Sequence, residues 1–174
     1  MNNAFIYLKY FLFYLKAKSI ISGSTDADKL IHFIEVAQDI HIQNYLGGNL
    51  YDKLQALIIS GDIDLPANSD YKSLRDVYIK PMLIWFTQAE YFPFSMFKID
   101  NGGISKHRGE DSDSVNYSDE DRMMSKINER AEFYTKRFLD YICFNSNKYP
   151  EYNNNSNGDM YPDKDANDFS SFVL

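Results

Sequence analysis

The sequence contains few of the residues that hold metal ions or form disulfides. One cysteine, Cys143, and three histidines occur in 174 residues. A single cysteine excludes an internal disulfide framework and a multi-cysteine zinc site, which favours synthesis in a reducing cytoplasm. His32 and His41 lie nine positions apart, too far for two zinc ligands on one helical turn. We therefore expect neither a metal nor a cofactor, and interpret His41 as a satisfied core or interface histidine.

Catalytic signatures are missing as well. The sequence has no phosphate-binding glycine motif and no Gly-x-Ser-x-Gly nucleophile motif. Asn153–Gly158 imitates the start of an EF-hand loop, but Lys164 stands where that loop requires a bidentate Glu. We therefore expect that the chain is not an enzyme and has no catalytic residue. If a site were nevertheless hidden in the fold, its candidates would be Glu90, His107 and Asp140.

The chain also lacks an excess of positive charge. Lysine and arginine number 18 against 25 aspartates and glutamates, which gives a formal net charge of −7. A protein that grips nucleic acid neutralises its phosphates with basic side chains, so this class is disfavoured. An acidic wall past which double-stranded DNA slides is compatible with the charge, because it repels the phosphate backbone.

No apolar run is long enough for a membrane span. The strongest, Phe5–Leu15, is interrupted by Lys9, whereas a spanning helix needs about 20 apolar residues. Basic residues follow it at Lys16 and Lys18, although a signal peptide carries them first. We expect no membrane partner, and interpret residues 1–24 as an aromatic segment that docks on this domain or on a neighbouring subunit.

Aromatic residues, by contrast, are abundant. The chain has 14 tyrosines and 13 phenylalanines but a single tryptophan. Aromatic side chains bring large apolar area at low side-chain entropy, so an excess suits subunit contacts as well as a core. Composition alone leaves these two uses equally open.

A first helix is predicted after the N-terminal segment. Thr25 or Asp26 can cap its N-terminus, and Gly47–Gly48 can end it with a left-handed cap. One face carries residues at helical spacing: Leu30, Phe33, Ile34, Ala37, His41 and Tyr45. Three apolar residues lie on other sides: Ile31, Val36 and Ile42. Such a helix is either central to a bundle or shared with another subunit.

Two further helices follow. Asn49 can cap the second helix, which Ser60–Gly61 closes. Apolar and aromatic residues hold one face over Asp70–Phe92. This phase survives Pro81, which predicts one kinked, continuous helix. Pro93 is expected to stop it.

The last helix is predicted from Ser118 to about Phe144, because acids in its first turn suit the helix dipole and apolar residues recur behind them. Before it, the Asn101–Gly102 pair stands between short apolar stretches. This pair indicates a β-hairpin within a loop region at about 94–117. Beyond Asn145 the chain is polar and buries too little apolar surface to order itself alone.

Together these elements predict a mainly α fold, a four-helix bundle with a short β-hairpin and extended, partner-docking termini. The helical domain is expected over residues 25–145, and residues 146–174 are expected to form an extended tail. This tail ends in apolar residues, which suggests a polar tether with an apolar hook: Phe169, Phe172 and Leu174.

The order of several motifs resembles that of a known family. Ile34–Gly47 reads IEVAQDIHIQNYLG, and Asn49–Leu54 reads NLYDKL. Tyr78–Tyr91, Asn101–Ile104 and Ala131–Tyr141 continue the pattern. This arrangement resembles head–tail connector, or head-completion (neck ring), proteins of tailed bacteriophages, in particular those of phages that infect Bacteroidetes, including the crAss-like kind.

The resemblance, which covers roughly residues 25–150, implies a connector-type bundle and a structural virion protein made in the host cytoplasm. Its copies would form a ring, a dodecamer by resemblance, below the portal protein. The ring would extend the DNA channel and offer a platform to further neck or tail proteins. Contacts are expected in the first helix, the hairpin and the tail: Ile31, Val36, Ile42, Asn101, Gly102, Gly103, Ile104, Phe169, Phe172 and Leu174.

An alternative is a small acidic, phage-encoded interaction protein that is absent from the virion, such as an inhibitor of a host factor. Its acidic charge would mimic DNA toward a host enzyme. The two hypotheses differ in one simple observation, since only the ring protein occurs in purified particles.

Overall fold

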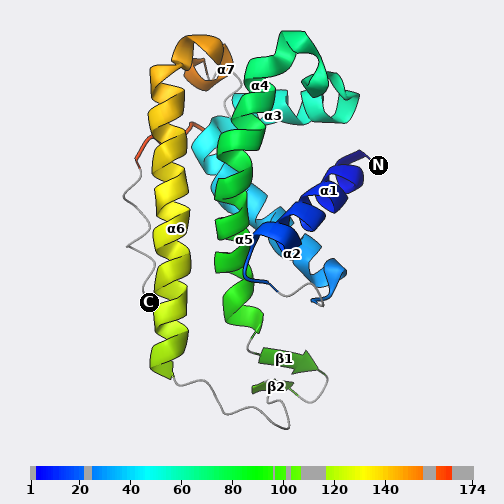
Figure 1. Cartoon of the computed structure of the whole chain (residues 1–174), viewed down its shortest axis with the longest axis vertical. Coiled ribbons are helices and arrows are strands. Elements are labelled where there is room, and N and C mark those ends of the chain that lie inside the picture. The colour runs from blue at the N-terminus through cyan, green and yellow to red at the C-terminus, as the bar shows by residue number, and fades with distance from the viewer. Residues whose placement is uncertain are drawn as a thin grey trace.

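The protein is mainly α, as the sequence predicts, with about four long helical rods packed together (Figure 1). This architecture is seen in a computed structural model that describes residues 3–21, 25–95, 97–100, 103–106, 117–154 and 160–165. The rods enclose one continuous hydrophobic core.

One rod runs through the middle of the molecule and organises the packing (Figure 1). It comprises α4 (Ser69–Ser73), a π-helical stretch (Leu74–Ile79) and α5 (Lys80–Ser95). All side chains from Met82 to Gln88 are buried. α5 is therefore covered from several sides, by α6 on one flank and by α2 on another.

Two prolines shape this rod. It continues through Pro81, as predicted, and the π-helical stretch immediately precedes that proline. The wider π turn accommodates the missing N–H group and the clash of the ring with the preceding turn. The expectation that Pro93 stops the helix was wrong, because α5 continues to Ser95. So close to the helix end Pro93 removes one backbone hydrogen bond, and the Ser95 hydroxyl donates to the Phe92 carbonyl at 2.7 Å.

A second rod crosses this one. It comprises α2 (Ala27–Ala37), a π-helical stretch (Gln38–Ile42) and α3 (Gln43–Ser60). Asp26 caps α2, one of the two predicted caps, and its carboxylate accepts a hydrogen bond from the Asp28 N–H at 3.0 Å. This cap satisfies one of the N–H groups that the first turn leaves without a helical partner.

The second rod bends at Gly47. The φ of 71° and ψ of 160° at this residue interrupt α3, and helical residues resume directly after it. A positive φ is what the Gly47–Gly48 pair predicts. However, a left-handed cap has a ψ of about 47°, so the predicted cap geometry was wrong although the chain does change direction here.

α3 ends where the sequence predicts. Gly61 has a φ of 79° and a ψ of 0°, a left-handed cap that glycine adopts readily. Two 3₁₀ turns, Asp62–Asp64 and Pro66–Asn68, connect α3 to α4. Ile63 in this connection is fully buried and anchors it to the core.

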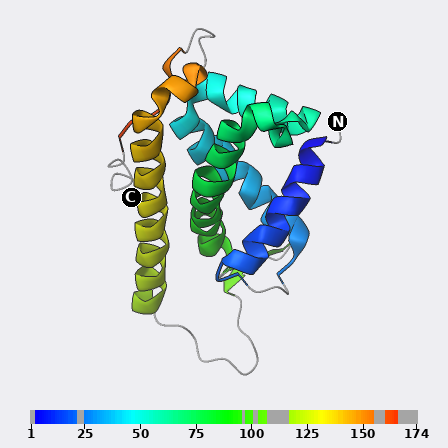
Figure 2. The ribbon, with the colours of Figure 1, turned by 45° about the horizontal axis from the view of Figure 1, so that its top comes forward.

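α6 (Tyr117–Phe144) lies alongside α5 and covers one flank of it (Figures 1 and 2). Its bounds agree with the prediction to within one residue. The side chains that it buries recur at helical spacing: Ile127, Ala131, Thr135, Phe138, Leu139 and Ile142. The opposite face of α6 is left to solvent.

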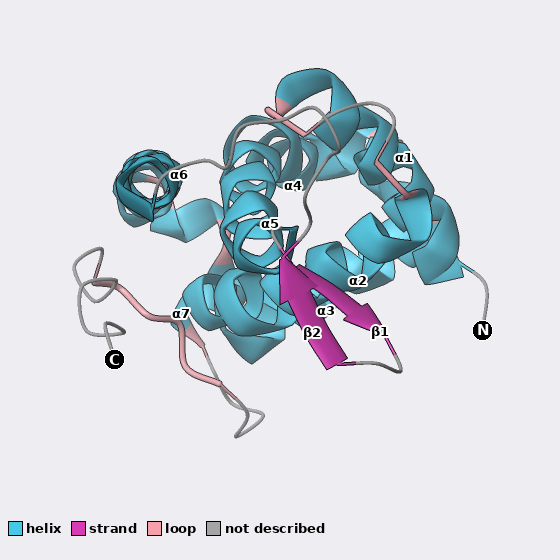
Figure 3. Cartoon of the chain, turned by 90° about the horizontal axis from the view of Figure 1, so that it is seen from below, coloured by secondary structure: helices cyan, strands magenta, loops and turns pink. Residues whose placement is uncertain are grey.

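α1 (Asn3–Lys18) lies on the other side of α5 from α6, a placement that all views of the ribbon share (Figures 1, 2 and 3). Leu15 is fully buried, and the Ile20 N–H donates to Gln88 Oε1 at 3.2 Å. Residues 1–24 were expected to dock either on this domain or on a neighbouring subunit, and their described part packs on this domain. None of the helices in the described ranges combines the length and apolarity needed to cross a membrane.

The C-terminal region contributes to the core. A 3₁₀ turn (Ser146–Lys148) and α7 (Pro150–Asn153) follow α6, and they bury Tyr149 and Tyr152. The extended tail expected over residues 146–174 is therefore wrong for its first part. The local sequence does not predict the burial of these two tyrosines, because their neighbours in sequence are polar and their burial depends on contacts with distant elements.

A later part of the C-terminal region, residues 160–165, lies against the bend in α3. The Gly48 N–H donates a hydrogen bond to the Met160 carbonyl oxygen at 2.8 Å. A Cβ atom added at Gly47 would lie 2.7 Å from Pro162 Cδ. Glycine is therefore required here by close approach as well as by its positive φ.

Two short strands follow α5. β1 (Phe97–Asp100) and β2 (Gly103–Lys106) pair antiparallel, with Ile99 opposite Ile104. They lie beyond the end of α5 that is opposite α7 (Figure 1). The predicted turn, Asn101–Gly102, lies outside the described residues.

Candidate interaction surfaces

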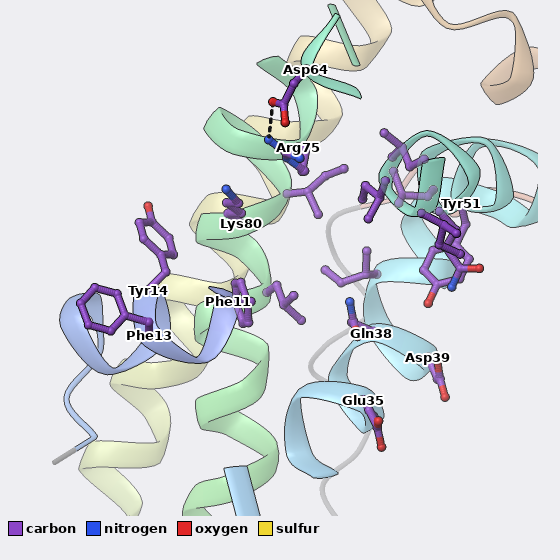
Figure 4. Close-up of a pocket in the computed structure, with 18 residues that line it drawn as sticks. Phe11, Phe13, Tyr14, Glu35, Gln38, Asp39, Tyr51, Asp64, Arg75 and Lys80 are labelled. Atoms are coloured by element: carbon purple, nitrogen blue, oxygen red, sulfur yellow. Dashed lines mark ion pairs between the residues drawn. The ribbon is translucent and has the colours of Figure 1, made fainter. Parts of the chain in front are cut away.

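An open groove of about 920 Å³ lies between α1, the rod formed by α2 and α3, and α5 (Figure 4). Leu46, Leu54 and Leu83 line it and are buried. At its rim, Phe13 of α1 is 79% exposed and Ile59 of α3 is 50% exposed. An apolar groove with an exposed apolar rim is the kind of surface that a partner covers.

The basic side chains of the groove are paired within it. Arg75 Nε and Lys80 Nζ each lie 2.7 Å from Asp76 Oδ1, and Arg75 lies 4.0 Å from Asp64 (Figure 4). Burial raises the pKa of Asp76, but the hydrogen bonds from Arg75 and Lys80 outweigh it and hold that pKa below its ordinary value. The carboxylate therefore stays ionised and pairs with both bases, one negative charge beside two positive ones.

The acids on the other wall of the groove are not compensated in this way. Glu35 and Asp39 are exposed and lie on the side opposite Phe13 (Figure 4). Among the described residues neither acid forms an ion pair. Tyr51, which is near them, has its pKa raised by burial and further by the charge of Asp39. This wall thus presents negative charge to a partner.

The outward face of α6 carries two exposed aromatic side chains. Phe133 is 62% exposed and Phe144 is 89% exposed. At 1.5 Å and 100° per residue they lie about 16 Å apart along the helix and about 20° apart around it. Glu129, Lys136 and Asp140 are exposed on the same face. We call these five residues the α6 stripe.

The histidine on the first predicted helix has a structural partner. His41 Nε2 lies 2.7 Å from Glu90 Oε1, and its ring stacks on Phe86 with centroids 4.2 Å apart, as the apolar face predicts. Of the hypothetical catalytic residues, Glu90 is thus hydrogen-bonded to His41. Asp140 lies on the α6 stripe, and His107 is outside the described residues. Within the part of the chain that the structure describes, no three His, Cys, Asp or Glu side chains could hold a metal ion together.

The contact residues predicted on the first helix lie only partly at the surface. Ile42 is 3% exposed and belongs to the core, and it also lines the groove, so its role in a contact stays a prediction. The π-helical stretch shifts the helical phase and turns this residue inward. Ile31 and Val36 are half-buried, and Gly103 and Ile104 belong to β2. The other predicted contacts lie outside the described residues: Asn101, Gly102, Phe169, Phe172 and Leu174.

Sequence reasoning missed the α6 stripe, and of its predicted contact residues only Ile42 is a described lining residue of the groove. Phe133 and Phe144 lie off the apolar phase of the last helix, and this mismatch was a signal that could have identified them. The groove had no comparable signal, because three rods that are far apart in sequence form it.

Residues 42–161 match a family described as a family of unknown function, DUF6712. The match begins in the π-helical stretch before α3 and extends to the segment that packs on the bend at Gly47. No curated protein and no solved structure matches the chain. Because the matched residues make up more than half of the chain, the protein belongs to the DUF6712 family.

Proposed function

We propose that the protein is a structural virion subunit that forms a homo-oligomeric ring at the head–tail junction of a tailed bacteriophage, below the portal protein. The resemblance of its motif order to neck ring proteins supports the phage context. The ring extends the channel for double-stranded DNA and offers a platform to further neck or tail proteins. A net charge of −7 suits such a channel, because acidic residues repel the DNA backbone.

The observation that carries the proposal is the position of two different apolar surfaces. The groove is walled by α1, and the stripe is carried by α6. The helices α1 and α6 lie on opposite sides of α5 (Figures 1 and 2). A ring of identical subunits needs heterologous contacts, in which one patch of each copy meets a different patch of the next. Two unlike surfaces on opposite flanks meet this requirement.

The test is assembly with the portal protein. We expect mass photometry and electron microscopy of the purified chain with portal to show a closed ring seated on the portal, with twelve copies if the resemblance holds. A chain that stays monomeric with portal present would refute the proposal. Proteomics of purified virions separates it from the host-factor inhibitor, because the ring protein is present in particles and the inhibitor is absent.

A further inference from the structure

We infer that the groove of one copy receives the α6 stripe of the next copy in the ring. The inference rests on the proposed function, since it names the contact through which that ring closes. The partner is a second copy of this chain. Its recognised element is an amphipathic helix face that lays exposed aromatic side chains into an apolar groove.

The apolar parts of the two surfaces match in kind. Phe133 and Phe144 of the stripe are the most exposed aromatic side chains that the structure describes on α6. The groove, at about 920 Å³, is as large as cavities that bury whole drug-sized ligands. It therefore has room for aromatic anchors. Its rim residues Phe13 and Ile59 lose solvent exposure when these anchors enter.

The charges match as well. Lys136 lies one turn from Phe133 and, among the described side chains, has no ion pair. Within the described part of the chain, Glu35 and Asp39 on the groove wall form no ion pair either. A stripe that inserts Phe133 brings Lys136 toward these acids, which stabilises the complex through opposite charge.

The remaining charges of the stripe do not oppose this fit. Glu129 is already paired with Lys126 of its own helix, with Nζ and Oε2 at 2.5 Å. Asp140, one turn beyond Lys136, meets a groove whose bases are Arg75 and Lys80. The stripe thus presents a base and an acid to a groove that carries both signs.

The placement of the two surfaces gives the contact a direction. α6, which carries the stripe, and α1, which walls the groove, lie on opposite sides of α5 (Figures 1 and 3). Two copies joined by one contact therefore still have a free stripe at one end and a free groove at the other. Such a heterologous contact repeats from copy to copy, and it closes into a ring when the rotation between neighbouring copies divides a full turn.

The aromatic anchors are tested by substitution on one helix. Phe133→Asp and Phe144→Asp should each raise the concentration at half-assembly about 30-fold or more, as expected for anchor residues at an interface. Met123→Asp is the matched control, since Met123 is exposed on α6 but lies off the stripe. Circular dichroism verifies that all three variants keep the fold. Equal effects of the three substitutions would overturn the inference.

A charge exchange tests the pairing itself. Lys136→Glu alone, and Glu35→Lys with Asp39→Lys, should each weaken assembly at least tenfold at low salt. The variant that combines all three substitutions should recover assembly to within about threefold of the wild type, because opposite charges again face each other across the contact. A combined variant that assembles no better than the single-sided variants would show that these residues do not meet.

The same assay keeps the inference and the proposed function apart when it is run with and without portal protein. If the wild type forms a ring on the portal but the charge exchange does not restore assembly, the inferred contact is wrong and the proposed function stands. If the charge exchange restores a self-assembled ring but that ring never binds portal, the inferred contact stands and the proposed function is wrong.

Discussion

Gly47 meets two constraints that a residue with a Cβ atom cannot meet. Its combination of φ 71° and ψ 160° is one that glycine alone adopts readily, and an added Cβ would lie 2.7 Å from Pro162 Cδ. Gly61 meets only a backbone constraint, since its φ is 79° but no atom of the described residues lies within 4 Å of an added Cβ. The two glycines therefore form a natural comparison.

Gly47→Ala should lower the free energy of unfolding by more than Gly61→Ala. Backbone strain costs about 1–3 kcal/mol at either position, and displacement of residues 160–165 adds to the loss at Gly47. Urea unfolding of the two variants measures the difference. Equal losses would show that the contact with Pro162 contributes nothing.

Tyr149 and Tyr152 are both buried but differ in their hydroxyl groups. The Tyr149 hydroxyl donates to the Asp70 carbonyl oxygen at 3.1 Å and lies 2.9 Å from the Tyr141 hydroxyl. The buried Tyr152 hydroxyl has no hydrogen-bond partner among the described residues. Tyr149→Phe should cost about 1–2 kcal/mol and Tyr152→Phe should be neutral or stabilising. Thermal or urea unfolding compares them, and the reverse order would refute this account of the two hydroxyls.

The buried tyrosines also set an alkaline limit to stability. Burial raises the pKa values of Tyr71, Tyr149 and Tyr152 above the ordinary value of 10.0. Below pH 10 both states keep these protons, and above it only the unfolded chain releases them, so stability falls as pH rises. The slope is about 1.4 kcal/mol per pH unit for each tyrosine that ionises only on unfolding. Urea unfolding at pH 9 and pH 11 measures it, and Tyr152→Phe should reduce the fall.

At the scale of elements, the C-terminal region contains structure that local sequence patterns do not predict. Helical periodicity predicted α5 through Pro81 and α6 almost to the residue, because each carries apolar residues at helical spacing along its length. The 3₁₀ turn and α7 have no such pattern. They fold because Tyr149 packs edge-to-face against Tyr71 of α4, with ring centroids 5.6 Å apart, a contact between residues far apart in sequence. The π-helical stretches escaped prediction for a similar reason, since packing decides where an extra residue enters a helix.

Truncation separates the two parts of this region. A chain that ends at Asn145 should lose several kcal/mol of stability, since removal of a buried aromatic side chain costs about 3–5 kcal/mol. A chain that ends at Asp165 should unfold like the full chain, yet assemble less well if Phe169, Phe172 and Leu174 dock on a partner. Urea unfolding and mass photometry of both chains give the answer. Full assembly by the longer truncation would refute the docking role of the tail.

At the scale of the whole molecule, the arrangement of the two surfaces predicts how defective copies behave together. Phe133→Asp breaks the stripe and leaves the groove, whereas Ile59→Lys breaks the groove and leaves the stripe. Each variant alone should stay monomeric. Their mixture should form one-to-one complexes, because a single head-to-tail contact remains between them. Mass photometry of the mixture decides, and a mixture of monomers only would contradict a head-to-tail contact.

The overall class of the fold could be predicted because helix signals are local, whereas the surfaces could not. Asp26 and Gly61 act through their immediate neighbours, so sequence identified them. The groove depends on how α1, α3 and α5 cross. Ile42 illustrates the difference, since its exposure was inferred from an undistorted helix and the actual helix turns it into the core.

The contact between the bend in α3 and residues 160–165 has a consequence for the order in which the chain folds. The Asn44 side chain donates to Asp163 Oδ2 at 3.3 Å, across a sequence separation of 119 residues. A ribosome releases the N-terminal partner of this pair long before the C-terminal one. The corner of the molecule at Gly47 is thus completed only after residues 160–165 have left the ribosome, and a nascent or truncated polypeptide that lacks them exposes this corner to chaperones and proteases.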